Sequence, residues 1–403
     1  MNAIVNPANT PGQFPRAVSL LLNVAHAIDH MFLLIFATAV ASIAVEFGFS
    51  NWTDLMPYSV GAFVLFGLGA LPAGRFGDVW GRRNMMIVFF IGIGLSALLV
   101  AATQNAWQLA AALTVLGAFA AIYHPVGIPM LVQHVSNPGA VIGINGLAGN
   151  LGIAVAALVT GLLVKWIGWR AAFVLPGIVA IGCGIVFAIV CPIEAEAPSK
   201  RKGGKAKVVL TPAMLARAFA VMTVAAVASS LIFTFTTNGN AQLLAAGFVG
   251  VVEDPALLGA MLALVYAVAS LAQIVVGRLI DSMPFKPLQL WMSIAQIPLL
   301  IIAAHTQDWW LFAALLATMV FVFGSIPFTD AMIVRYVDDR LRSRVAGMRL
   351  TVAFGISSLA VWLLGPLVKG IGFSAALWIL AAIAAIRSAI VLLLPEEPAA
   401  EQT

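Results

Sequence analysis

The sequence predicts an all-α membrane protein with twelve transmembrane helices arranged as two pseudo-symmetric six-helix bundles. Three observations predict this class: an apolar composition, twelve long apolar runs and an internal repeat. Of the 403 residues, 62% are hydrophobic and 9% are charged, and the mean hydropathy is +1.04. Soluble domains carry about 25% charged residues. We therefore expect a multi-pass protein whose main partner is a lipid bilayer.

The apolar runs have the length of membrane-spanning helices. A helix needs about 20 apolar residues to cross the hydrocarbon core, and each run is near or above that length. Strands of membrane barrels alternate apolar and polar residues, whereas these runs are apolar on all faces. The predicted helices cover residues 17–45, 54–74, 84–103, 106–133, 140–164, 170–193, 213–245, 256–279, 286–304, 308–334, 345–369 and 372–394.

The most polar stretch, residues 194–212, divides the chain into two sets of six predicted helices. Its Pro, Gly and Lys content is typical of a solvated linker. The sequence therefore predicts five regions: an N-terminal tail, a first bundle, a cytoplasmic linker, a second bundle and a C-terminal tail. Their bounds are 1–16, 17–193, 194–212, 213–395 and 396–403.

The two predicted bundles resemble each other in sequence. GRFGD at 74–78 is echoed by GRLID at 277–281, and KWIGWRAAF at 165–173 by KGIGFSAAL at 369–377. The offset is 203 residues in the first pair and 204 in the second. Matches at a nearly constant offset indicate a duplicated six-helix unit, as in the parallel repeats of secondary transporters.

The basic residues predict the orientation in the membrane. With twelve spans, both termini lie on one side, and sixteen of the 21 Lys and Arg residues fall on that side. Only Lys165, Arg170 and Lys369 fall on the other. Cytoplasmic loops are enriched in Lys and Arg, so we expect both termini in the cytoplasm of a bacterial-type inner membrane. This orientation explains the net charge of +5, so we expect no nucleic-acid partner. We expect the protein to be a monomer.

A charged motif, GRFGDVWGRR at 74–83, lies between the second and third predicted helices. It resembles the signature loop of the major facilitator superfamily. The resemblance implies the major facilitator fold, alternating access and no enzymatic activity. The matching residues are Gly74, Asp78, Gly81, Arg82 and Arg83.

The same resemblance implies a conformational gate. Asp78 would latch the two halves together near the start of the eleventh helix, while the glycines would let the loop turn and the arginines would bind acidic partners. Asp281 is the repeat counterpart of Asp78. We expect Asp330 and Arg349 to pair beside this loop.

A narrower resemblance rests on three short stretches: HAIDH at 26–30, YHPVG at 123–127 and GNLG at 149–152. Together they resemble the fosmidomycin-resistance branch of the superfamily, whose members export small organic molecules with proton coupling. The chain departs from the antiporter pattern, because Ala156 and Ala157 stand where such exporters carry a Gly-Pro motif. The direction of transport therefore stays open.

Ionisable residues interrupt the first predicted helix. At about 100° per residue, His26, Asp29 and His30 share an arc of about 100°, so one face of this helix is polar. A charge at the centre of a bilayer costs at least about 2.5 kcal/mol. Such a face is therefore expected to line a central cavity, with His124 as its partner from the fourth helix.

The second bundle lacks these groups. At an offset of about 203 residues, Ser229 corresponds to His26 and Ile326 to His124. A purely architectural need should appear in both halves, so the asymmetry favours a task such as carrying a proton. Histidine titrates near pH 6.5. We predict proton-coupled secondary transport of a small organic solute, with a satisfied packing cluster as the alternative interpretation.

Further polar residues are candidates for the substrate cavity: Tyr123, Asn238, Tyr266 and Gln273. Asn238 lies in FTFTTNGNAQ, residues 233–242. We expect a polar break there, since broken helices present backbone groups to substrates. The alternative is the end of the helix.

The sequence leaves two alternative functions. His26, Asp29, His30 and His124 are also possible ligands of a transition-metal ion, because imidazoles at i and i+4 can chelate; this alternative is a metal transporter. An intramembrane enzyme or a sensor is the third. The sequence contains neither HExxH nor GxxxxGK[ST], the motifs of zinc proteases and nucleotide-binding loops. We therefore expect no catalytic residues, no cofactor and no enzyme.

Overall fold

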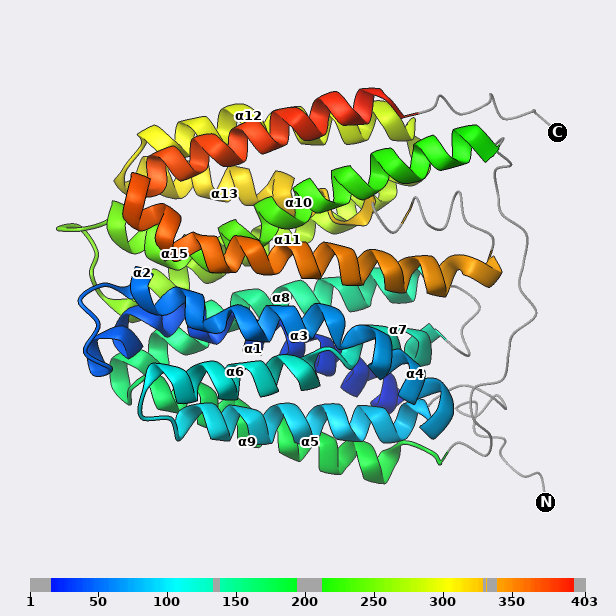
Figure 1. The fold of residues 1–403 in the computed structure, drawn as a ribbon, viewed down its shortest axis with the longest axis horizontal. Helices are drawn as coiled ribbons and strands as arrows, with labels where there is room; N and C mark the ends of the chain where they lie inside the picture. The colour runs from blue at the N-terminus through cyan, green and yellow to red at the C-terminus, as the bar shows by residue number, and fades with distance from the viewer. Residues whose placement is uncertain (1–15, 133–137, 194–211, 329–330, 332–338, 395–403) are drawn as a thin grey trace, which may run out of the picture.

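The computed structural model describes residues 16–132, 138–193, 212–328, 331 and 339–394. Every element in these ranges is helical, and most helices run lengthwise beside one another (Figure 1). The all-α prediction is confirmed. The elements are α1 (Arg16–Glu46), α2 (Trp52–Leu55), η1 (Met56–Ser59), α3 (Val60–Leu68), α4 (Ala70–Trp80), α5 (Arg82–Ala101), α6 (Ala106–Ala120), α7 (Tyr123–Val132), α8 (Pro138–Trp166), α9 (Trp169–Val190), α10 (Pro212–Gly247), α11 (Pro255–Ser282), α12 (Phe285–His305), α13 (Asp308–Gly324) and α15 (Asp339–Leu392).

The membrane spans of the described residues are consistent with the predicted number. Within the described ranges, ten stretches are long and apolar enough to cross a membrane. The last of them, Met348–Leu392, is interrupted at Gly372, whose φ of 77° and ψ of 168° are not helical; glycine adopts such angles without a steric penalty. Asp308–Gly324 adds an apolar helix of 17 residues. Twelve spans are consistent with this arrangement.

Prolines divide two of the predicted helices. Pro57 is the second residue of the short η1 element inside the second span. The fourth span consists of α6 and α7, which meet at a turn just before Tyr123. Pro125 has no N–H to donate to the carbonyl four residues earlier, which favours a break in the helix at this point. The turn places His124 in the first turn of α7.

The first and second halves of the chain lie on opposite sides of the molecule, with α8 and α15 near the middle (Figure 1). α8 and α11 approach closely across this boundary. A Cβ at Gly161 would lie 2.5 Å from the Pro255 carbonyl oxygen, and one at Gly259 would lie 2.6 Å from that of Ala157. The predicted linker lies outside the described residues except for Pro212, so the predicted domain boundaries stay predictions.

Two ion pairs join the halves at one end of the molecule. Lys165, at the end of α8, pairs with Asp254, which caps the start of α11. Lys369 Nζ lies 2.5 Å from Asp54 Oδ1. This end is remote from the start of α1 and the end of α15, which both lie at the other end of the molecule (Figure 1). The positive-inside prediction assigns it to the extracellular side.

The predicted polar break in the seventh helix is wrong, because α10 is continuous from Pro212 to Gly247. Its polar side chains bond to their own helix. The Thr236 and Thr237 hydroxyls donate to the carbonyls of Ile232 and Phe233. Such bonds to the preceding turn satisfy hydroxyls inside a helix, so these residues do not require a break.

Candidate functional site

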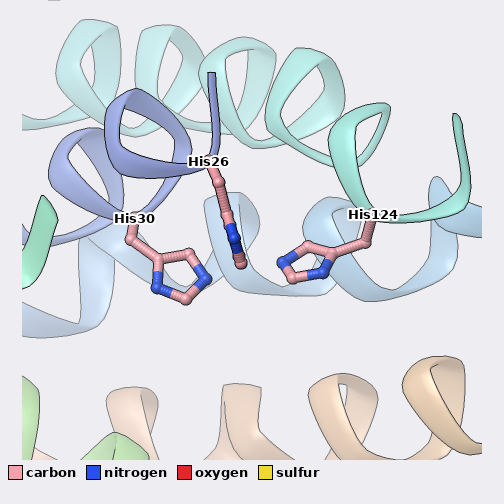
Figure 2. A group of neighbouring side chains, drawn as sticks. All are labelled: His26, His30 and His124. Carbon is pink, nitrogen blue, oxygen red and sulfur yellow. The ribbon is translucent and has the colours of Figure 1, made fainter. Parts of the chain in front are cut away.

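The candidate site is a cluster of three imidazoles and one carboxylate in the first half of the chain. His26 and His30 project from α1, His124 projects from α7, and the three rings point toward one another (Figure 2). The ring centroid of His26 lies 4.6 Å from that of His30 and 5.0 Å from that of His124, and the last two lie 5.6 Å apart. The residues expected to share one face do lie together.

His26 is held by contacts with α7 and α8. Its Nδ1 lies 2.7 Å from the backbone oxygen of Asn145, and its ring stacks on Tyr123 at 4.8 Å. A Cβ at Gly149 would lie 2.6 Å from His26 Cε1 and Nε2. The glycine that begins GNLG therefore makes room for this imidazole.

Tyr123 and Asn145 fasten three helices together. The Tyr123 hydroxyl donates to the Leu22 carbonyl at 2.9 Å and accepts from Asn145 Nδ2 at 2.7 Å. Asn145 Nδ2 also donates to Asn23 Oδ1 at 2.9 Å. These buried bonds fix the spacing of α1, α7 and α8 around the histidines. The structure thus places Tyr123, predicted in the cavity, behind His26.

Asp29 is fully buried at 0% exposure. Its Oδ2 lies 3.5 Å from His124 Nε2, and within the described part of the chain neither carboxylate oxygen has a hydrogen-bond partner. An ionised carboxylate removed from water costs several kcal/mol unless it is paired. The carboxylate and the facing imidazole are therefore placed to share a proton or another cation.

The cluster is not sealed from solvent. The His124 side chain is 14% exposed, and His30 is also partly exposed. Phe354 of α15 lies against His124, with ring centroids 6.1 Å apart, and α15 passes opposite α1 and α7 (Figure 2). Asp29 thus lies behind imidazoles that solvent can reach.

Arg349 adds a positive charge to this region. We expected it to pair with Asp330 in the gate, but its charge lies within electrostatic range of His124. Asp330 lies outside the described residues. Arg349 lies five residues before Phe354 on α15. The same stretch of α15 therefore brings both an aromatic ring and a guanidinium toward the histidines.

The other cavity candidates lie in the second half. Asn238 is buried and donates to the Thr234 carbonyl at 2.9 Å. The buried Tyr266 hydroxyl donates to the Thr237 carbonyl at 3.1 Å. Gln273 faces α8, since its Oε1 lies 3.6 Å from where a Cβ on Gly146 would stand. The side chains of Asn238 and Tyr266 thus bond to backbone carbonyls of α10. Gln273 lies beside α8, the helix whose Asn145 backbone oxygen bonds to His26.

The signature motif is mostly helical rather than a loop. Gly74 belongs to α4, where it faces Pro125 of α7, so the expectation that Gly74 turns the backbone is wrong. Gly81 does turn it, with a φ of 98° between α4 and α5. Gly77 allows α4 to pack closely against α7, since a Cβ added at Gly77 would lie 3.0 Å from a methyl group of Val126.

The motif arginines bond to backbone carbonyls. Arg83 Nε donates to the Cys191 carbonyl at 2.9 Å, and Arg83 Nη2 donates to that of Ala188 at 2.5 Å. Arg82 Nη1 donates to the Pro129 carbonyl at 3.4 Å. The last carbonyls of a helix lack intrahelical partners and carry the negative end of its dipole, which corrects the expectation of an acidic partner for Arg83. The side chains of Asp78 and Asp281 lie outside what the structure describes.

Sequence reasoning missed a buried arginine in the second half. Arg387 is 2% exposed and donates to Ser229 Oγ at 2.8 Å. Ser229 occupies the position that corresponds to His26 in the repeat. The isolated charge in a predicted span was the available signal, but its place near the inner end of the twelfth helix was interpreted as snorkelling to the surface, whereas the structure buries it.

One family model and two proteins of known name match parts of this sequence. The family model described as "Major Facilitator Superfamily" matches residues 22–253, more than half of the chain. A puromycin resistance protein of Streptomyces alboniger is 31% identical over 136 residues, which are 33% of this chain and 27% of that protein. A probable actinorhodin transporter of Streptomyces coelicolor is 30% identical over 152 residues, which are 36% of this chain and 26% of that protein. The matches thus span about a quarter of these relatives.

Solved structures share the fold over nearly the whole chain. A bacterial homolog of the human lysosomal transporter Spinster, in an inward-facing and occupied conformation, has a TM-score of 0.76 at 14% identity. The match covers 96% of this chain and 97% of that one. The inward-facing and unoccupied form of such a homolog has a TM-score of 0.66 at 15% identity, with 94% of each chain covered. At these identities the likeness establishes the fold.

Proposed function

This chain belongs to the major facilitator superfamily, and from this premise we propose that it is a proton-coupled secondary transporter of a small organic solute. The family consists of membrane transporters and not of enzymes, so the chain is a multi-pass transport protein. The coupling ion, the solute class and the residues that carry the proton are our proposals.

The observation that carries the proposal is the buried carboxylate of Asp29. It has no hydrogen-bond partner among the described residues and lies 3.5 Å from His124. Intramembrane ionisable residues that face partners or water are typical of proton relays. We assign Asp29 as the proton carrier and the partly exposed His124 and His30 as the route between it and solvent, with His26 fixing the geometry.

The names of the relatives support an organic solute. One is a puromycin resistance protein and the other a probable actinorhodin transporter, and both names refer to organic molecules. The resemblance to the fosmidomycin-resistance branch points to the same chemical class. We favour a small organic molecule as cargo and leave the direction of transport open, because Ala156 and Ala157 replace the antiporter motif.

Alternating access would use the boundary between α8 and α11. The Lys165–Asp254 and Lys369–Asp54 pairs and the Gly161–Gly259 contact favour closure at one end. We propose that this end is extracellular, that both termini are cytoplasmic and that the membrane is a bacterial-type inner membrane. Opening would then require both ion pairs to separate.

Solute-evoked proton movement tests the proposal. The purified chain is reconstituted into liposomes that contain a pH-sensitive dye, and a panel of organic solutes that includes puromycin is added outside. We expect at least one solute to change the internal pH in vesicles with the wild-type chain, and Asp29→Asn to abolish that change. A solute that is transported without proton movement would overturn the coupling.

A further inference from the structure

We propose that His26, His30 and His124 together bind one divalent transition-metal ion. Each offers one imidazole nitrogen, and these three nitrogens all lie within 4.8 Å of one another. The rings come from α1 and α7 and point toward one shared space (Figure 2). Imidazole is a preferred ligand of zinc, copper and nickel ions.

The hydrogen bond of His26 leaves its other nitrogen available to a metal. Nδ1 lies 2.7 Å from the Asn145 backbone oxygen. A carbonyl oxygen only accepts, so Nδ1 carries the hydrogen and Nε2 of the neutral ring has a free lone pair. Nε2 is buried and has no hydrogen-bond partner among the described residues. Metal-binding histidines almost always donate their other N–H in this way.

The surroundings of His30 and His124 are also compatible with metal binding. The backbone of Gly149, one turn beyond Asn145 on α8, lies close to His30, which comes four residues after His26 on the same helical face. His124 Nε2 is buried without a hydrogen-bond partner in the described part of the chain. One helix, α8, thus orients the imidazole of His26 and lies beside that of His30, while the third imidazole comes from α7.

Distances and charge are compatible with an ion. Zinc binds nitrogen at about 2.0–2.1 Å in a tetrahedron, which separates two ligand nitrogens by about 3.3 Å. Small side-chain rotations would therefore complete the site. Three histidines with an open fourth position form a known zinc donor set. The Asp29 carboxylate, 3.5 Å from His124 Nε2, offsets the charge of the ion, whereas the charge of Arg349 near His124 opposes it.

Binding of the ion does not require that the ion is cargo or that the chain transports anything. Where the proposed function holds, the ion and the coupling proton compete for the same nitrogens, because a metal binds only the unprotonated imidazole. Because metal binding does not depend on transport, the metal-binding proposal and the transport proposal can each be wrong while the other is right.

Cobalt and zinc titrations test the inference. The full chain, purified in detergent through a tag that contains no histidine, is titrated with Co²⁺ by visible absorption and with Zn²⁺ by calorimetry. We expect one ion per chain and the absorption of tetrahedral cobalt. His26→Ala, His30→Ala and His124→Ala should each weaken binding by about tenfold or more. The Gln variants replace any Ala variant that does not fold.

Two control variants separate this site from adventitious binding. His305 lies outside the cluster, where its Nε2 accepts from Trp378 Nε1 at 3.0 Å, so His305→Ala should bind the ion as the wild type does. Gly149→Ala should weaken binding about tenfold, because its Cβ displaces the His26 ring. Gly143→Ala on the same helix has open space around it and should have no effect.

The inference is overturned if the wild-type chain binds no ion. It is also overturned if the three histidine variants bind as tightly as the wild type, or if His305→Ala loses as much affinity as they do. None of these outcomes affects the proposed transport, because solute-evoked proton movement is measured with metal chelator present.

Discussion

Tyr123 positions the histidine site through both its aromatic ring and its hydroxyl. Its ring stacks on His26, while its hydroxyl bonds to Leu22 and Asn145. The helical period was enough to predict that His26, Asp29 and His30 share a face, since that depends on one helix only. The Asn145 carbonyl under His26 was not predictable, because a contact between helices depends on where they cross.

Tyr123→Phe tests this support. The change leaves the Leu22 carbonyl and an Asn145 N–H short of a partner, and we expect the free energy of unfolding to fall by about 1 kcal/mol. Tyr58→Phe is the matched control, because its hydroxyl has no hydrogen bond among the contacts that the structure describes, and it should change stability by less. Denaturant unfolding in detergent measures both. Equal losses would contradict the role of the Tyr123 hydroxyl.

At the scale of elements, apolar length predicted where the helices lie but not how they are divided. α1 was expected at 17–45 and spans Arg16–Glu46. The second and fourth spans contain turns beside Pro57 and Pro125, because proline removes a backbone donor. The signature motif resembled a loop, yet most of it continues α4, and within it Gly77 allows close packing against α7.

Gly161→Ala tests the close contact of α8 with α11. Its Cβ would meet the Pro255 carbonyl oxygen at 2.5 Å and Gly259 Cα at 3.1 Å. Both are backbone atoms, so the helices must separate, and overpacking costs about 1–3 kcal/mol. We expect slower disulfide cross-linking of a Lys165→Cys, Asp254→Cys pair. Gly182→Ala has nothing within 4 Å of its Cβ and should leave the rate unchanged; an equal decrease would contradict the account.

At the scale of the molecule, the two halves are held by ion pairs as well as by packing. The hydrogen bond from Lys165 keeps the pKa of the Asp254 carboxyl below its usual value of 3.8. A carboxyl whose pKa is lowered by folding stabilises the folded state above its unfolded pKa, and this contribution disappears as the pH falls through the folded pKa. The effect is expected to be small, because both side chains are about one-third exposed and salt screens them.

This pair makes a pH-dependent prediction. In low salt, the wild-type chain should be more stable than Asp254→Asn at pH 7. The difference should begin to shrink as the pH falls below about 3.8 and should vanish once the pH has fallen through the lower folded pKa. Thermal unfolding at a series of pH values measures the difference between the two proteins, so that other carboxyls cancel. A difference that persists unchanged at pH 3 would show that the pair does not join the halves as an ion pair.

The central claim is that Asp29 carries the coupling proton, and solute flux in two modes tests it most directly. For a solute found by the proton-movement screen, Asp29→Asn should abolish accumulation driven by a pH gradient and should retain exchange of labelled for unlabelled solute, because exchange needs no net proton transfer. Glu253→Gln, an exposed carboxyl outside the spans, should retain both modes. Accumulation by Asp29→Asn at the wild-type rate would contradict the account.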